Sequence, residues 1–263
     1  MGPYLGFINR NTVLHRLDPV LKLVALCAVA VGVLIYSSWS VNALVLIVLI
    51  VMFRVAKTRI GLASKRVKFL LFFSIFLVLL QVLVTPNGTV LFYVLPGPAL
   101  PVTTFGLERG LSLALRFLLI VFSSILFVSV TDPSLLAQGL TRLGVPYRYS
   151  FMLVVALRFL PLFESENQSV RLAQKSRGIE PDVRSLSGIL RTVRYTFFPL
   201  LVSALSRVDS LAMSMDGRGF GFAKKRTFVR RSTWSTADTL FSALVFGYLI
   251  MCVLLASGFI GLY

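Results

Sequence analysis

The chain has 263 residues, of which 57% are apolar and only 14% are charged, and its mean hydropathy is +0.86. In soluble domains about half of the residues are apolar, so this composition excludes a soluble domain. Together with the long apolar runs it predicts an all-α integral membrane protein. The net charge of +17 can indicate a nucleic-acid partner. The cations, however, are distributed as membrane topology requires, so we expect contact with a lipid bilayer and no nucleic acid.

We predict five membrane spans, at residues 20–36, 41–53, 69–84, 105–130 and 240–259. Asp18 and Pro19 suit the start of the first helix, with Asp as the cap and Pro in the first turn. The turn SSWSVN after the first span and the Pro-rich stretch VLPGPALPVTT before the fourth carry no charge. Both are predicted to be loops.

Charge placement orients these spans. Residues 54–68 contain six cations and no acid, whereas the loops at 37–40 and 85–104 contain no cation. Since cytoplasmic loops hold the excess of Lys and Arg, we predict a cytoplasmic N-terminus and Tyr263 outside. The chain is then expected to have three parts: a four-span region (1–130), a cytoplasmic region (131–237) with sixteen of the 27 cations, and the last span (238–263). The basic run KKRTFVRR is expected to attract anionic lipid.

The cytoplasmic region predicts two long kinked helices. The first is apolar from Ser150, is interrupted by Pro161 and becomes polar before Gly178 and Pro181 end it. The second covers 187–216 with a kink at Pro199. Beyond that kink one face is apolar: Leu201, Leu205, Val208, Leu211, Ala212 and Met215. The opposite face is polar: Ser203, Ser206, Arg207, Ser210 and Ser214. The two helices could simply pack on each other, but they have more apolar surface than they can cover, which favours a partner.

Each of these helices ends in small–Arg–Gly: Ser176-Arg177-Gly178 and Gly217-Arg218-Gly219. A cation at a helix C-terminus also complements the helix dipole, which is the simpler interpretation of one such ending. Two endings favour docking, because an exposed Arg between small residues can enter a groove and pair bidentately with a carboxylate. A partner with two grooves, a dimer, fits two endings.

The sequence shows no catalytic, metal or cofactor site. It has no GxxxxGK[ST] loop, its only histidine is His15, and Cys27 and Cys252 lie apart in apolar runs. Glu164 and Glu166 are two residues apart and face different sides of a helix. An enzyme that acts on lipid phosphates and a channel remain as alternatives. The channel is suggested by Arg116, because a charged residue inside a membrane span often has a function. The simpler interpretation of Arg116 is a hydrogen-bonded link between spans.

Four stretches resemble the transmembrane T component of energy-coupling-factor (ECF) transporters, the EcfT/CbiQ family: LDPVLKL (17–23), TDPSLLAQGL (131–140), RFLPLFESENQSVRLAQKSRG (158–178) and LAMSMDGRGF (211–220). The third stretch is the most specific. The resemblance covers nearly the whole chain and implies a non-catalytic scaffold in the cell membrane of a prokaryote. Such a scaffold joins two ABC-type ATPases, which bind the ATP, to an S component that binds a vitamin or metal ion.

By this resemblance Arg177 and Arg218 are the docking arginines of two coupling helices. Their small neighbours would be Ser176, Gly178, Gly217 and Gly219; the family has Ala where this chain has Ser176 and Gly217. The apolar face of the second helix (Leu201, Leu205, Val208, Leu211 and Met215) is then expected to pack on the S component. The cargo stays open, as does the choice between a shared module and a dedicated cobalt, nickel or single-vitamin system.

Overall fold

The computed structural model describes residues 12–36, 38–57, 65–85, 89–93, 101–179, 185–222 and 234–257. It divides into two compact units, one comprising 1–139 with 232–263 and the other 140–231. We call them the membrane unit and the helix-pair unit. The predicted division into three parts refers to the bilayer and stays a prediction.

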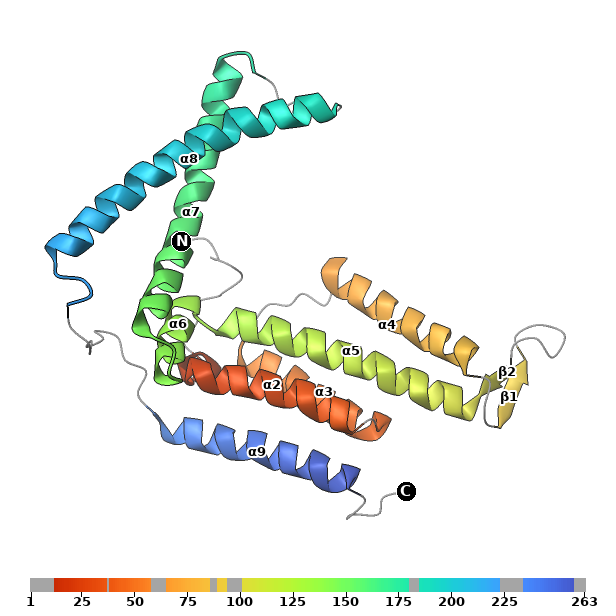
Figure 1. Cartoon of the computed structure of the whole chain (residues 1–263). Helices are drawn as coiled ribbons and strands as arrows, with labels where there is room; N and C mark the ends of the chain where they lie inside the picture. Colours follow the sequence, from red (N-terminus) through yellow and green to blue (C-terminus); the bar gives the residue numbers. More distant parts are fainter. Residues whose placement is uncertain are drawn as a thin grey trace. The chain divides into compact units, whose positions relative to one another are not determined.

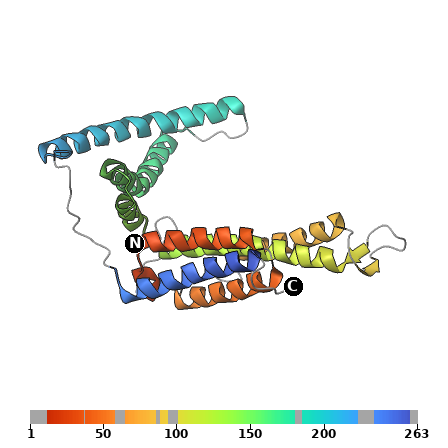
Figure 2. The same cartoon turned by 60° about the horizontal axis from the view of Figure 1, so that its bottom comes forward.

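The membrane unit contains the five predicted spans. They are α2 (Pro19–Ile35), α3 (Trp39–Val55), α4 (Lys65–Val84), α5 (Thr104–Val130) and α9 (Thr236–Ala256), with a short α1 (Val13–Arg16) before them. α5 packs against α2, α3 and α4, and α9 packs on α2. Figures 1 and 2 show α2, α3, α5 and α9 side by side. The predicted all-α membrane architecture is confirmed.

Length and composition separate these helices. α4, α5 and α9 have windows of mean hydropathy 2.3–2.6 and are long enough to cross a bilayer, while α2 and α3 are shorter apolar helices of 17 residues. The second helix of the other unit is also long enough, but its window has a hydropathy of only 1.2. By composition it is the most polar of the four long candidates.

One part of the loop predicted at 85–104 is a β-hairpin. β1 (Val90–Tyr93) pairs antiparallel with β2 (Pro101–Thr103), with Val90 opposite Thr103. Two strands this short have no detectable alternation of polar and apolar residues, so the sequence did not reveal them. Thr103 fixes the next helix, because its hydroxyl donates to the Thr85 carbonyl and accepts from the Gly106 N–H, both at 3.1 Å.

Small residues bring the membrane helices together. A Cβ on Gly32 of α2 would lie 2.6 Å from the Tyr248 ring of α9, and one on Gly110 of α5 would lie 3.1 Å from the Val78 carbonyl of α4. The central core cluster is Val33, Leu49 and Leu119, buried to 5% exposure or less. Close backbone approach through glycine is usual in membrane helix packing.

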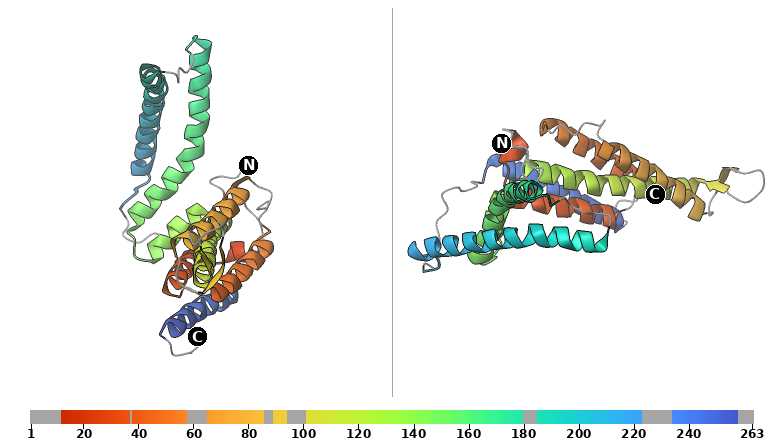
Figure 3. Two further views of the ribbon diagram at one scale, coloured as in Figure 1. Left: turned by 90° about the vertical axis from the view of Figure 1, so that its right-hand side faces the viewer. Right: turned by 90° about the horizontal axis from the view of Figure 1, so that it is seen from above.

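The helix-pair unit consists mainly of α7 (Tyr147–Ser176) and α8 (Leu186–Gly217), while α6 (Pro133–Arg142) crosses the boundary between the units. Both long helices continue through their internal prolines, Pro161 and Pro199. They cross in opposite directions (Figures 1 and 3). The end of α7 meets the first half of α8, and Phe220 after α8 packs on Tyr147 and Phe151 at the beginning of α7.

Some predicted features lie outside the described residues. These are the run KKRTFVRR (224–231), Pro181, the centre of the basic loop (58–64), the first eleven residues, and the segment from 258 to Tyr263. Their predictions stand as stated.

Candidate functional site

The first Arg-Gly end closes α7 with a Schellman cap. Gly178 N–H donates to the Lys175 carbonyl and Ile179 N–H donates to the Gln174 carbonyl, both at 3.0 Å. In this pattern the residue after the cap adopts the left-handed conformation that favours glycine, and Gly178 has a φ of +74°. Arg177 is therefore held at the cap position by its backbone neighbours.

The second Arg-Gly end closes α8 in the same way. Gly219 N–H donates to the Asp216 carbonyl at 2.9 Å, and Phe220 N–H donates to the Met215 carbonyl at 3.0 Å. Gly219 has a φ of +65°. The two ends thus place an arginine at the same cap position, although the residues that precede the arginines differ.

The space around both ends is open. A Cβ added to Gly178, Gly217 or Gly219 would meet no atom within 4 Å. The backbone conformation explains Gly178 and Gly219, but nothing within the described residues requires a glycine at Gly217. A partner surface could therefore approach the main chain closely at each end.

Both arginines are exposed, and within the described part of the chain neither makes a side-chain hydrogen bond or ion pair. Because Phe220 packs on the beginning of α7, the Arg218 end lies near one end of that helix and Arg177 closes the other. The 30 residues of α7 correspond to about 45 Å of helix. The pair thus presents two similar cations at widely separated points.

A polar clamp holds the helices near their crossing. Arg207 of α8 forms an ion pair with Glu166 of α7, and the Ser203 hydroxyl donates to the same carboxylate at 2.9 Å. The hydrogen bonds from Ser203 and Arg207 hold the pKa of Glu166 below its ordinary value. The sequence showed that Glu166 and Glu164 face different sides, but it gave no signal for a partner so distant in the chain.

The clamp uses the polar face of α8, so the apolar face points away from α7. Leu201, Leu205 and Val208 are 39%, 55% and 53% exposed. Leu211 and Met215 are half-buried. An amphipathic helix normally buries its apolar side. Here that side is left largely uncovered by the described chain, which is the arrangement expected of a surface that binds a partner.

The LDP motif has a structural role in the membrane unit. The Asp18 carboxylate caps α2 by accepting the Val20 N–H at 2.9 Å, and the Asp18 N–H donates to Asp238 at 2.9 Å. Asp238, fully buried, also accepts the Ser235 N–H at the start of α9. These bonds join the beginnings of two spans that are far apart in the sequence.

Lys22 of α2 joins this region to α1 and to the end of α5. Its ammonium group donates to the His15 and Val130 carbonyls, each at 3.2 Å. The TDP motif follows Val130, and Asp132 caps α6 by accepting the Ser134 N–H at 2.9 Å. The resemblance was based in part on these two motifs, and the structure shows that both build helix starts.

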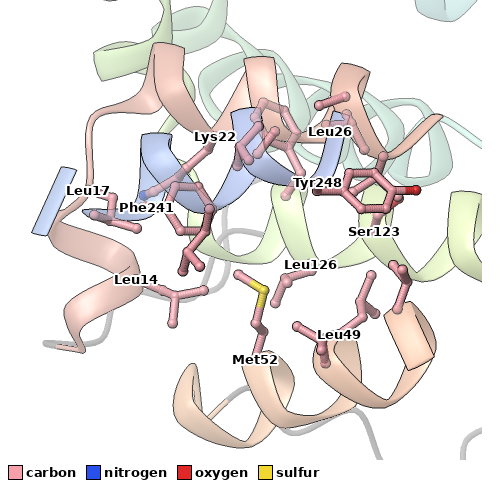
Figure 4. Close-up of a pocket in the computed structure, with 18 of the residues that line it drawn as sticks. Leu14, Leu17, Lys22, Leu26, Leu49, Met52, Ser123, Leu126, Phe241 and Tyr248 are labelled. Carbon is pink, nitrogen blue, oxygen red and sulfur yellow. The ribbon is translucent and has the colours of Figure 1, made fainter. Parts of the chain in front are cut away.

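An apolar cavity of about 300 Å³ lies between α2, α3, α5 and α9. Figure 4 shows Phe241 and Tyr248 on one side and Leu49 and Met52 on the other, with Lys22 at one end. The Lys22 amine already has two carbonyl partners. The lining therefore lacks the convergent polar groups that a polar solute requires.

The described residues also include side chains of the types that form the ligand sets of metal sites. Among the described residues no group of three or more His, Cys, Asp or Glu side chains is placed to hold a metal ion.

Arg116 Nε is buried in α5 without a hydrogen-bond partner in the described structure. The link between spans that we expected of Arg116 is therefore not made by that atom.

Comparison with known proteins decides the family. A profile of the family described as "Cobalt transport protein" (CbiQ) matches residues 10–228. The chain belongs to this family. Curated relatives carry the name energy-coupling factor transporter transmembrane protein EcfT. The one from Listeria innocua is 32% identical over 89% of this chain and 90% of its own length. The relatives from Streptococcus equi and Lactococcus lactis are 29% and 28% identical over 94% and 97% of this chain, and over 94% and 96% of their own lengths.

Membership of the EcfT/CbiQ family confirms the resemblance inferred from the four sequence stretches. The CbiQ match includes both Arg-Gly ends and the clamp between α7 and α8. With its apolar helices, the chain is a multi-pass membrane protein of a prokaryote and a T component of the energy-coupling-factor class.

Proposed function

We propose that this chain is the non-catalytic scaffold of an ECF-type importer. It would couple ATP hydrolysis by two cytoplasmic ABC-type ATPases to movement of a membrane S component that binds a vitamin or another micronutrient. One observation carries the proposal: two exposed arginines occupy the same capped position at widely separated points of one helix pair. No cofactor of its own is assigned to the chain.

Each arginine is suited to docking. The Schellman cap fixes the backbone, so less conformational freedom is lost on binding. A guanidinium group with no internal partner can bind a carboxylate through two parallel hydrogen bonds. The open space at Gly178, Gly217 and Gly219 lets the groove of a partner reach the main chain. Two such points on one helix pair match a partner that has two copies of one groove.

The apolar face of α8 would pack on the S component. Leu201, Leu205 and Val208 are exposed because Ser203 and Arg207 on the other face bind α7. Motion imposed at the two arginines would then reach the S component through the same helix. The helix-pair unit would lie in the cytoplasm with the N-terminus, and the C-terminus would lie outside, as the excess of cations supports.

Charge reversal at the ends tests the docking. Arg177→Glu and Arg218→Glu should each weaken copurification of the ATPases, because an unpaired buried carboxylate in the partner costs on the order of 2–5 kcal/mol. Arg171→Glu is the matched control: it makes the same charge change on an exposed face of α7. If the double variant retains the ATPases in the yield of the control, the docking assignment is wrong.

The cargo follows from the partner. The family is described as a cobalt transport protein, so a dedicated cobalt or nickel system is the second candidate. The curated relatives carry the general EcfT name, which fits a module shared by several S components. Gentle purification of the tagged chain from its host, followed by mass spectrometry, distinguishes them. Several S components would indicate a shared module, and one would indicate a dedicated transporter.

A further inference from the structure

Pro199 leaves a carbonyl of α8 without its intrahelical donor. Proline has no N–H, so the carbonyl four residues earlier cannot form the usual helical hydrogen bond. That carbonyl belongs to Tyr195. In the structure the side chain of Gln174, on α7, donates to it from Nε2 at 3.3 Å, and α8 continues unbroken through the proline.

Gln174 also takes part in the first Arg-Gly end. Its main-chain carbonyl accepts the N–H groups of Arg177 and Ile179, both at 3.0 Å. One residue therefore joins the cap of α7 to the kink of α8, through its carbonyl on one side and its side-chain amide on the other. The reverse orientation of the amide would set two oxygens together, so the Tyr195 carbonyl dictates which end donates.

Packing around the kink is loose. A hollow of about 250 Å³ is lined by Gln174, Arg194, Tyr195, Phe198 and Pro199. Phe198 is 56% exposed, and Gln174 Oε1 is buried without a hydrogen-bond partner in the described structure. Among the described residues, the hydrogen bond from Gln174 is the one polar contact between α7 and residues 194–200 of α8.

We propose that Gln174 is a positioning residue that holds the Pro199 kink and mechanically links the Arg177 end of α7 to α8. A displacement of the Arg177 end is carried to α8 at its most deformable point. The link itself is a property of this chain. Its consequence for transport rests on the function proposed above.

The link is tested on the full chain in lipid nanodiscs, with spin labels at Leu190→Cys and Val208→Cys in a Cys27→Ala, Cys252→Ala background. Both label sites are exposed and lie about 27 Å apart along a straight helix. Gln174→Ala should broaden the distance distribution. Gln168→Ala, the same substitution at an exposed position of α7, should leave it narrow.

Adding Pro199→Ala should narrow the distribution again, because an alanine at that position supplies the N–H that the Tyr195 carbonyl lacks. A general loss of packing would not be rescued by that second substitution. A Gln174→Ala distribution as narrow as that of Gln168→Ala, or a broadening that persists with Pro199→Ala, overturns the link.

In the complete transporter Gln174→Ala should lower ATP-driven uptake roughly fivefold, the effect expected of one lost hydrogen bond. The copurifying ATPases should stay unchanged, because both arginines and the main-chain carbonyl at position 174 remain. Loss of the ATPases in this variant, as severe as with Arg177→Glu, overturns the proposed role as a link. Retention of the ATPases by Arg177→Glu, with the broadening intact, refutes the proposed function and leaves the link standing.

Discussion

Asp238 is the polar residue on which the start of α9 depends. It is fully buried, and its carboxylate accepts the Asp18 N–H at 2.9 Å and the Ser235 N–H at 2.8 Å. Asp238→Ala removes both bonds and leaves the buried Asp18 N–H unsatisfied. Hydrogen bonds to charged groups contribute about 1.5–3 kcal/mol each, and the Ser235 bond is only partly buried, so we expect a loss of about 3–4 kcal/mol.

Thermal unfolding of the purified chain in detergent measures this loss. For a protein of this size it corresponds to a fall in Tm of about 6–16 °C. Asp238→Asn keeps one acceptor oxygen, so its Tm should fall less than that of Asp238→Ala. Asp209→Ala, at an exposed position of α8, should leave Tm nearly unchanged. A fall of less than about 2 °C for Asp238→Ala would refute the view that this carboxylate joins α2 to α9.

Three further predictions use the same thermal assay. Gly32→Ala should lower stability by about 1–3 kcal/mol, because its Cβ would lie 2.6 Å from the Tyr248 ring; measured in a Tyr248→Ala background, the same Gly32→Ala change should cost much less. The pKa of Glu166 is depressed, so the stability that its ionised carboxylate contributes is fully present at neutral pH. This contribution is lost as the pH falls below the ordinary glutamate pKa of about 4.3 and through the depressed pKa of Glu166. Glu166→Gln should abolish that pH dependence. Gly178→Ala should cost about 1–2 kcal/mol, because its φ is +74°, whereas Gly217→Ala should cost nothing.

The sequence predicted the helices well because their signals are local. The first span, predicted at 20–36, is α2 (Pro19–Ile35), and the second long kinked helix, predicted at 187–216, is α8 (Leu186–Gly217). Long apolar runs and the capping residues determine such boundaries. Both arginine helices end where glycine permits a left-handed residue, so their ends could also be located from the sequence.

The contacts between helices could not be predicted, because their signals are not local. Periodicity indicates that α8 has an apolar face, but not which face contacts α7. The usual expectation, that the apolar face packs inward, would have been wrong here: Arg207 and Ser203 bind Glu166 and leave Leu205 exposed. The bond from Gln174 to the Tyr195 carbonyl likewise depends on a crossing geometry that no local pattern specifies.

The two units are stabilised by different kinds of contact. The helices of the membrane unit are joined by buried hydrogen bonds to Asp238 and by glycine contacts such as that of Gly32 with Tyr248. Buried contacts of this kind resist change, because the structure relaxes only partly around them. The helix pair is joined by a partly exposed ion pair, which water screens and so weakens, and by a hydrogen bond at the Pro199 kink. Deformation therefore costs least between α7 and α8. If the proposed function is right, force enters at the two arginines. Compliance in the helices that carry them and stiffness in the membrane unit would then both serve transport.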